Sequence, residues 1–208
     1  MSPESLSADA VARFLEKSAR ALREAASELD ALDAQIGDGD LGTSAATLFE
    51  AAIAELDTAP SSAGLLLSDF GDSIMRLCSG ASGTLYAVLF TTLGTELKAE
   101  AEITLEDLAQ GFRHAVERVK QLGGASPGDA TMIDAIEPFV ETLEEQAVSG
   151  AHMSDALTLA AVAADRGATS TSTLIARLGR ARGFGDRTLG HVDPGARSFA
   201  VIVGAWGG

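Results

Sequence analysis

Three aspartates in one short stretch have the types and spacing to bind a divalent cation. Asp33, Asp38 and Asp40 lie within eight residues, in the segment Asp33-Ala-Gln-Ile-Gly-Asp-Gly-Asp-Leu-Gly-Thr-Ser44. Carboxylates this close repel one another unless they share a cation, and oxygen ligands favour a hard ion such as Mg²⁺ or Ca²⁺. Because Mg²⁺ usually combines few carboxylates with phosphate oxygens and water, the stretch indicates a nucleotide site.

Two other binding motifs are excluded for this stretch, whereas a purely structural role stays open. A Gly-x-Gly-x-x-Gly spacing from Gly37 to Gly42 matches a dinucleotide fingerprint, but that motif follows a strand and a helical pattern precedes it here. An EF-hand beginning at Asp38 needs glycine at its sixth place and glutamate at its twelfth, where this chain has Thr43 and Phe49. Aspartate and glycine are also ordinary turn formers, so purely structural roles remain an alternative.

Two further loops are rich in glycine and precede helical patterns. Residues 79–84 read Ser-Gly-Ala-Ser-Gly-Thr, and residues 123–132 read Gly-Gly-Ala-Ser-Pro-Gly-Asp-Ala-Thr-Met. Backbone N–H groups at such helix starts can hold a phosphate. The structural alternative is a tight turn that caps the next helix through Ser82 or Thr84 in the first loop, and Asp129 or Thr131 in the second.

Arginine is concentrated near the C-terminus of an otherwise acidic chain. Five of the twelve arginines lie between residues 177 and 197, around a long glycine-rich loop at 179–195. In this loop, which we call the lid, Asp193-Pro194 is typical of a helix N-cap followed by proline at the first helical position. Arginine pairs well with phosphate oxygens, so a cationic cover over a nucleotide is one interpretation. Surface charge that balances the acidic body is the other.

The elements that must position these loops are helices. Apolar residues recur at intervals of three and four, with turn chemistry between the segments, which predicts an all-α fold of antiparallel helices. We expect no sheet and a single domain over residues 1–208. The eight predicted helices cover residues 10–32, 44–56, 65–77, 83–97, 105–122, 131–143, 154–178 and 196–206.

Composition excludes several classes of function. The chain has 30 acidic and 15 basic residues, a formal charge of −15, so it repels nucleic acid and anionic membrane surfaces. One cysteine, Cys78, excludes an internal disulfide and any multi-cysteine metal site. The chain has no leader-like segment and no membrane-length apolar run, so we expect a cytoplasmic protein. The three histidines assemble no catalytic triad by spacing.

Taken together, four motifs in order resemble the nucleotide-binding L subunit, or L domain, of the dihydroxyacetone kinases. They are Asp33…Ile-Gly-Asp-Gly-Asp40, Gly80-Ala-Ser-Gly83, Pro127-Gly-Asp-Ala-Thr-Met132 and Gly179-Arg-Ala…Gly190-His-Val-Asp-Pro-Gly195. The resemblance runs from about residue 10 to 203. It implies a barrel of eight antiparallel α-helices that binds a Mg-nucleotide, ATP or ADP, in loops at one end.

The resemblance also implies roles for individual residues. Asp33, Asp38 and Asp40 would hold Mg²⁺, as two ions, and Arg180 would be the catalytic arginine of the lid. The residues expected to contact the nucleotide are Leu41, Gly42, Thr43, Ser44, Ala81, Ser82, Gly123, Met132, Arg180, Asp193, Pro194 and Gly195. The family often has histidine where this chain has Leu41 and asparagine where it has Ser44, and by the resemblance this departure removes a polar side chain near the phosphates.

The implied reaction is phosphoryl transfer to a short-chain ketose such as dihydroxyacetone. In the family, a separate K subunit or domain carries the ketose, and 208 residues leave no room for it. The donor stays open between exchangeable ATP and bound ADP that a phosphocarrier M subunit rephosphorylates, as does a homodimer. The alternatives are a nucleotide-sensing regulator that acts through a protein partner and a purely structural helical domain.

Overall fold

The computed structural model describes residues 5–56, 62–97, 100 and 102–207, and helices dominate them. Two short strands, β1 and β2, pair antiparallel with Ser5 opposite Thr104. Two 3₁₀ segments, η1 and η2, lie between the last two α-helices. In chain order the elements are β1 (Ser5–Leu6), α1 (Ala8–Ile36), α2 (Leu41–Ala54), α3 (Ala63–Leu77), α4 (Ala81–Leu97), β2 (Ile103–Thr104), α5 (Leu105–Gly123), α6 (Ile133–Ser149), α7 (Met153–Ser170), η1 (Thr171–Thr173), η2 (Arg180–Thr188) and α8 (Pro194–Gly204).

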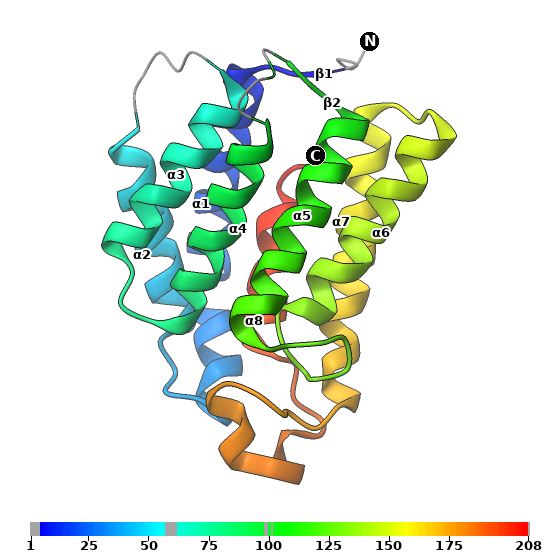
Figure 1. Ribbon diagram of the computed structural model, residues 1–208. Coiled ribbons are helices and arrows are strands. Elements are labelled where there is room, and N and C mark those ends of the chain that lie inside the picture. Colours follow the sequence, from blue (N-terminus) through cyan, green and yellow to red (C-terminus); the bar gives the residue numbers. More distant parts are fainter. Residues whose placement is uncertain (1–4, 57–61, 98–99, 101, 208) are drawn as a thin grey trace.

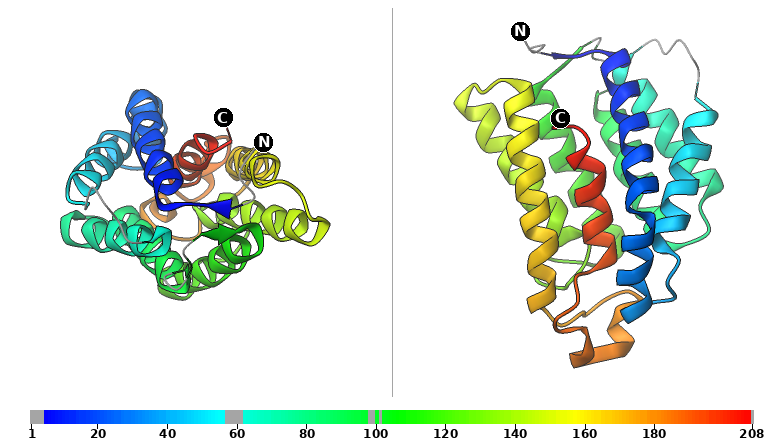
Figure 2. Two further views of the ribbon diagram at one scale, coloured as in Figure 1. Left: turned by 90° about the horizontal axis from the view of Figure 1, so that it is seen from above. Right: turned by 180° about the vertical axis from the view of Figure 1, so that it is seen from behind.

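The eight α-helices of the described residues follow one another around a ring. Each helix contacts the next in sequence, and α8 returns to contact α1, as the end-on view in Figure 2 shows. Successive helices run in opposite directions (Figure 1). The predicted all-α fold of eight antiparallel helices is confirmed, although the small β1–β2 pair was not expected.

Side-chain caps fix where several helices begin. Ser7 accepts a hydrogen bond from the amide of Ala10 at the start of α1. Thr104 and Asp107 form a reciprocal capping box at the start of α5, which satisfies two amides that the helix cannot pair itself. Asp193 caps α8 with Pro194 at the first helical position, as predicted.

The seventh helix ends earlier than predicted. It was expected to reach residue 178, but α7 stops at Ser170 and tightens into η1. The hydroxyls of residues 170–173 each donate to the backbone carbonyl three residues earlier. Such bonds compete with regular helical pairing, so this serine- and threonine-rich run ends the helix despite its apolar spacing.

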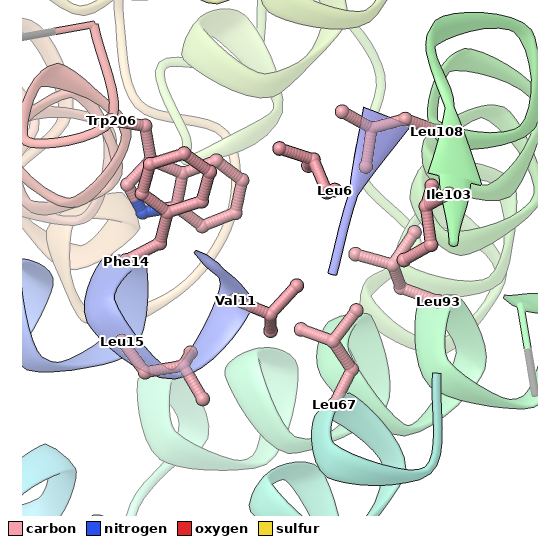
Figure 3. Close-up of a pocket in the computed structure, with 9 residues that line it drawn as sticks. All are labelled: Leu6, Val11, Phe14, Leu15, Leu67, Leu93, Ile103, Leu108 and Trp206. Carbon is pink, nitrogen blue, oxygen red and sulfur yellow. The ribbon is translucent and has the colours of Figure 1, made fainter. Parts of the chain in front are cut away.

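Most of the buried side chains form one core, which receives side chains from all eight helices. At the end that carries β1 and β2, nine apolar side chains surround a remaining cavity of about 10 Å³, which is room for little more than a single water molecule. Figure 3 shows Leu6, Ile103 and Trp206 closing this space. The ring of Trp206 stacks on Phe14 at 5.5 Å. This end of the ring is therefore filled.

No helix in the described part of the chain combines the length and the apolar character needed to cross a bilayer.

Glycines let α3 and α4 approach closely. A Cβ placed on Gly94 would overlap the backbone of Ser68 and Gly64, and one on Gly71 would overlap Thr91. Interiors packed this tightly respond to a single added methyl group.

We therefore expect Gly94→Ala to lower the free energy of unfolding by about 1–3 kcal/mol, because α3 and α4 must separate to admit the methyl group. Gly204→Ala is the matched control, since a Cβ at this helical position meets no atom within 4 Å and alanine favours a helix. Urea unfolding of both variants measures the difference. Equal stability of the two variants would contradict this account of the packing.

Candidate functional site

Four connections meet at the end of the ring opposite β1 and β2. Because successive helices alternate in direction, the links α1–α2, α3–α4, α5–α6 and α7–α8 all lie at this end (Figure 1). They border a cavity of about 910 Å³, which is large enough for a small-molecule ligand of nucleotide size. All four contribute residues to its lining. The antiparallel order of the helices thus brings together loops that are far apart in sequence.

The three predicted metal ligands lie together at this cavity. Asp33 is in the last turn of α1 and is buried, whereas Asp38 and Asp40 are exposed in the loop that follows. One carboxylate oxygen of each lies within 4.8 Å of the other two. Asp33 also accepts hydrogen bonds from the amides of Gly39 (2.8 Å) and Asp40 (3.2 Å). The donor set suits a hard cation such as Mg²⁺.

Two glycines make this turn possible. A Cβ on Gly37 would overlap the Asp33 carboxylate, so any larger residue would displace a proposed ligand. Gly39 has φ = 81°, a left-handed conformation that glycine adopts without strain. The loop therefore needs glycine at both positions to turn back over Asp33.

A cationic side chain already lies beside the cluster. Arg180, in η2, forms an ion pair with Asp38, and both side chains are more than half exposed to solvent. An exposed pair of this kind is weak and can exchange partners when another cation or anion arrives. Among the described residues, the guanidinium thus offsets part of the charge of the three carboxylates.

The lid is more ordered than the sequence predicts. It was expected to be a loop, but Arg180–Thr188 forms a 3₁₀ segment with a non-helical break at Gly185. Thr188 is buried, accepts a hydrogen bond from the amide of Ala176 (3.0 Å) and donates one to the carbonyl of Gly185 (2.8 Å). A second, small apolar cluster connects this segment to the end of α1 and comprises Ile36, Ala130, Ala176 and Ala181, with Leu174 packed against it.

The five arginines between residues 177 and 197 have different partners. Arg177 lies 3.8 Å from Asp129, and Arg187 stacks over Phe184 within the lid. Arg197 instead pairs with Glu28 and Asp165 and joins α8 to α1 and α7. Of the five arginines, Arg180 alone lines the cavity, so a cationic cover over a nucleotide rests on Arg180.

Asp134 organises the loop between α5 and α6, a role that the sequence analysis missed. Its carboxylate accepts hydrogen bonds from the amides of Gly128 (2.5 Å) and Thr131 (2.8 Å). Met132 holds the N-cap position of α6, but the Thr131 hydroxyl accepts from the first helical amide, that of Ile133 (3.3 Å). Asp129 accepts from the amide of Ser126 (2.8 Å) and does not cap the helix. The result is a turn that places Thr131 and Met132 on the cavity wall.

Asp193 has an unusual protonation equilibrium. It accepts the cap hydrogen bond from Ala196 (2.7 Å) and lines the cavity. Burial of its carboxyl raises the pKa of Asp193 to about 7, and the negative charges of Asp134 and Asp33 act in the same direction against the backbone hydrogen bonds. Asp33 and Asp193 therefore both line the cavity, and their negative charge favours a cation there.

All but one of the predicted site residues line this single cavity, in company with apolar side chains of α2 and α5 such as Leu48 and Val119. Gly42 is the exception, because it lies against α1, where a Cβ would overlap the carbonyl of Ala26. Those that line the cavity are Asp33, Asp38, Asp40, Leu41, Thr43, Ser44, Ala81, Ser82, Gly123, Met132, Arg180, Asp193, Pro194 and Gly195.

Comparison with known proteins finds a matching domain family and relatives of similar sequence. The DAK2 domain family matches residues 35–207. The chain is 36% identical to the ADP-binding subunit DhaL of the PEP-dependent dihydroxyacetone kinase of Escherichia coli, over 84% of each chain. It is 37% identical to a D-erythrulose kinase of Mycolicibacterium smegmatis, over 93% of this chain and 34% of that protein.

A solved structure agrees with these matches. The dihydroxyacetone kinase of C. freundii, in complex with AMP-PNP and Mg²⁺, superposes with a TM-score of 0.69 at 29% identity, over 100% of this chain and 35% of that one. The chain thus spans about a third of the length of that kinase and of the erythrulose kinase, and most of the length of the E. coli subunit. With its helical ring, its acidic loop and these matches, the chain belongs to the DAK2 domain family.

Proposed function

We propose that this chain is the Mg-nucleotide-binding subunit of a dihydroxyacetone-type kinase. The observation that carries the proposal is the cluster of Asp33, Asp38 and Asp40 at a cavity of about 910 Å³ that four loops border. The relatives support it, since one is named an ADP-binding subunit and another was solved with AMP-PNP and Mg²⁺. Residues 1–208 act as one nucleotide-binding domain.

The three aspartates would hold Mg²⁺, as two ions, at the phosphate end of the nucleotide. Mg²⁺ there neutralises phosphate charge and helps to position the transferred group. The first turns of α2 and α4, which include Thr43, Ser44, Ala81 and Ser82, carry the positive end of the helix dipole toward that anion. Gly123 and Met132 would contact the nucleobase and ribose, and the turn at 193–195 would belong to the lid that closes over the nucleotide.

Arg180 would move from Asp38 to the phosphates when the nucleotide binds. Its ion pair with Asp38 is exposed, so little free energy opposes the exchange. Charge-assisted contacts between a guanidinium and phosphate oxygens are stronger than neutral hydrogen bonds. Arg180 would then stabilise the charge that develops on the transferred group.

The phosphoryl acceptor is a short-chain ketose held on a separate K subunit. Among the described residues no histidine lines the cavity, and the loops that line it would be occupied by the metal and the phosphates. The donor is either exchangeable ATP or a phosphocarrier M subunit that rephosphorylates bound ADP, and both would act in the cytoplasm. The protein's own chemistry is positioning and charge neutralisation.

Removing one carboxylate should weaken metal-dependent nucleotide binding. We expect Asp38→Asn and Asp40→Asn each to raise the Kd for Mg-ADP at least about tenfold, or about 1.4 kcal/mol, because each loses a ligand of the cation. Asp69→Asn, an exposed aspartate on α3 outside the cavity lining, is the control. Isothermal titration calorimetry that finds wild-type affinity in both site variants would exclude the metal assignment.

Arg180 should matter for binding but hardly for stability. Arg180→Ala should weaken Mg-ADP binding about tenfold, because a charge-assisted contact is lost, while the melting temperature of the empty protein falls by less than about 2 °C. Arg182→Ala, exposed on the same 3₁₀ segment, should change neither quantity. A large loss of thermal stability in Arg180→Ala would instead identify a structural ion pair.

The isolated chain should bind Mg-nucleotide without phosphorylating a ketose. Without a bound hydroxyl near the terminal phosphate, the advantage of proximity is absent, and adding a K subunit should restore transfer. A coupled assay with dihydroxyacetone and erythrulose, with and without that subunit, measures this. Kinase-like turnover by the chain alone would reveal a sugar site here, whereas binding without turnover in the complex would favour a nucleotide-sensing regulator.

A further inference from the structure

Asp30 makes an unusual set of hydrogen bonds one turn before Asp33 on α1. Its Oδ1 accepts from the amides of Gly42 (2.7 Å) and Thr43 (3.0 Å), and its Oδ2 accepts from the hydroxyl of Thr43 (2.6 Å). These groups belong to the first turn of α2, on the far side of the acidic loop. One half-buried carboxylate of α1 therefore holds the beginning of the next helix.

This arrangement replaces the usual way of capping a helix. The side chain of an N-cap residue normally accepts from the second and third amides of its own helix. Asp40 occupies the N-cap position of α2, yet its side chain makes no such bond. Gly42 and Thr43, the second and third residues of α2, find their acceptor in Asp30 instead.

Because Asp30 caps α2, the Asp40 carboxylate is available for other partners. The backbone of Asp40 is fixed on both sides. Its amide donates to Asp33 (3.2 Å), and Asp30 holds the first turn of the helix that follows. Together Asp33 and Asp30, about one helical turn apart, accept from four backbone amides between Gly39 and Thr43. The loop is thereby fixed while an Asp40 oxygen remains within 4.8 Å of oxygens of Asp33 and Asp38.

Asp30 keeps its charge in this position. Burial raises the pKa of Asp30, but the hydrogen bonds from the Thr43 hydroxyl, the Thr43 amide and the Gly42 amide together outweigh it and leave the pKa below its usual value. A charged acceptor at a helix N-terminus is also favoured by the helix dipole. The capping bonds are consequently of the stronger, charge-assisted kind.

We infer that Asp30, with Thr43, is a positioning residue of the metal site: it caps α2 in place of Asp40 and so frees the Asp40 carboxylate to bind the cation. This inference rests on the proposed Mg-nucleotide function. It assigns Asp30 no contact with the metal or the nucleotide, since Asp30 is absent from the residues that line the cavity. Groups that orient metal ligands in this way commonly change metal affinity when they are removed.

The test is a Mg²⁺ titration at fixed ADP, followed by calorimetry, on the full chain. We expect Asp30→Ala to raise the Mg²⁺ concentration for half-saturation about tenfold, because Asp40 can then turn to cap its own helix. Thr43→Val, which removes one hydrogen bond without changing charge, should raise it about threefold. Thr43→Ser, which keeps the hydroxyl that Asp30 accepts from, should raise it less than Thr43→Val does.

Two controls separate positioning from charge and from stability. Glu24→Gln removes an exposed negative charge from the same helix and should leave the Mg²⁺ requirement unchanged. Amide hydrogen exchange at Gly42 and Thr43, measured without metal or nucleotide, should accelerate in Asp30→Ala even at temperatures where the variant is fully folded. Combining Asp30→Ala with Thr43→Val should weaken Mg²⁺ binding no further than Asp30→Ala alone, because both remove the same contact.

The outcomes distinguish this inference from the proposed function. If the wild type binds ADP in a Mg²⁺-dependent way but Asp30→Ala and Thr43→Val require no more Mg²⁺ than the wild type, Asp30 is only a structural cap and the inference is overturned. If Asp30→Ala and Glu24→Gln change the Mg²⁺ requirement equally, long-range charge explains the effect and the inference is again wrong. If the wild type shows no Mg²⁺-dependent binding, the proposed function fails and the inference falls with it.

Discussion

The alternating direction of the helices is the constraint on which the site depends. In an up-and-down ring, every second connection returns to the same end, so the links after α1, α3, α5 and α7 must meet (Figures 1 and 2). Packing supplies the ring, with close contacts of small residues such as Gly71 and Gly94 between α3 and α4. The opposite end is closed by β1, β2 and Trp206 (Figure 3). The candidate site therefore lies at the end of the ring opposite β1 and β2.

At that end the chain must hold negative charges together. Three carboxylates converge within 4.8 Å, and Asp193 adds an acidic group to the lining of the same cavity. Backbone amides, the Arg180 guanidinium and the N-termini of helices offset part of this repulsion. Burial, with a smaller contribution from the charges of Asp134 and Asp33, raises the pKa of Asp193 to about 7.

Much of this could be predicted from the sequence, because its signals are local. Apolar spacing located the eight helices, and the acidic loop identified the three aspartates, which depend only on a helix end and a tight turn. Features that depend on contacts between distant segments could not be predicted. The end of α7 depends on hydroxyl-to-carbonyl bonds in the run at 170–173, and the order of the lid depends on the apolar cluster around Ala176 and Ala181. The roles of Asp30 and Asp134 arise only once loop amides come within reach of their carboxylates.

The central claim is that Asp33, Asp38 and Asp40 bind the metal of a nucleotide complex. The most direct measurement is an anomalous difference map from crystals grown with ADP and Mn²⁺, which takes oxygen ligands as Mg²⁺ does. The account predicts Mn²⁺ peaks within roughly 2.0–2.3 Å of carboxylate oxygens of these aspartates, with ADP in the cavity between the four loops and its phosphates at the metal. A nucleotide bound elsewhere, or ADP in the cavity with no metal peak at the three carboxylates, would contradict it.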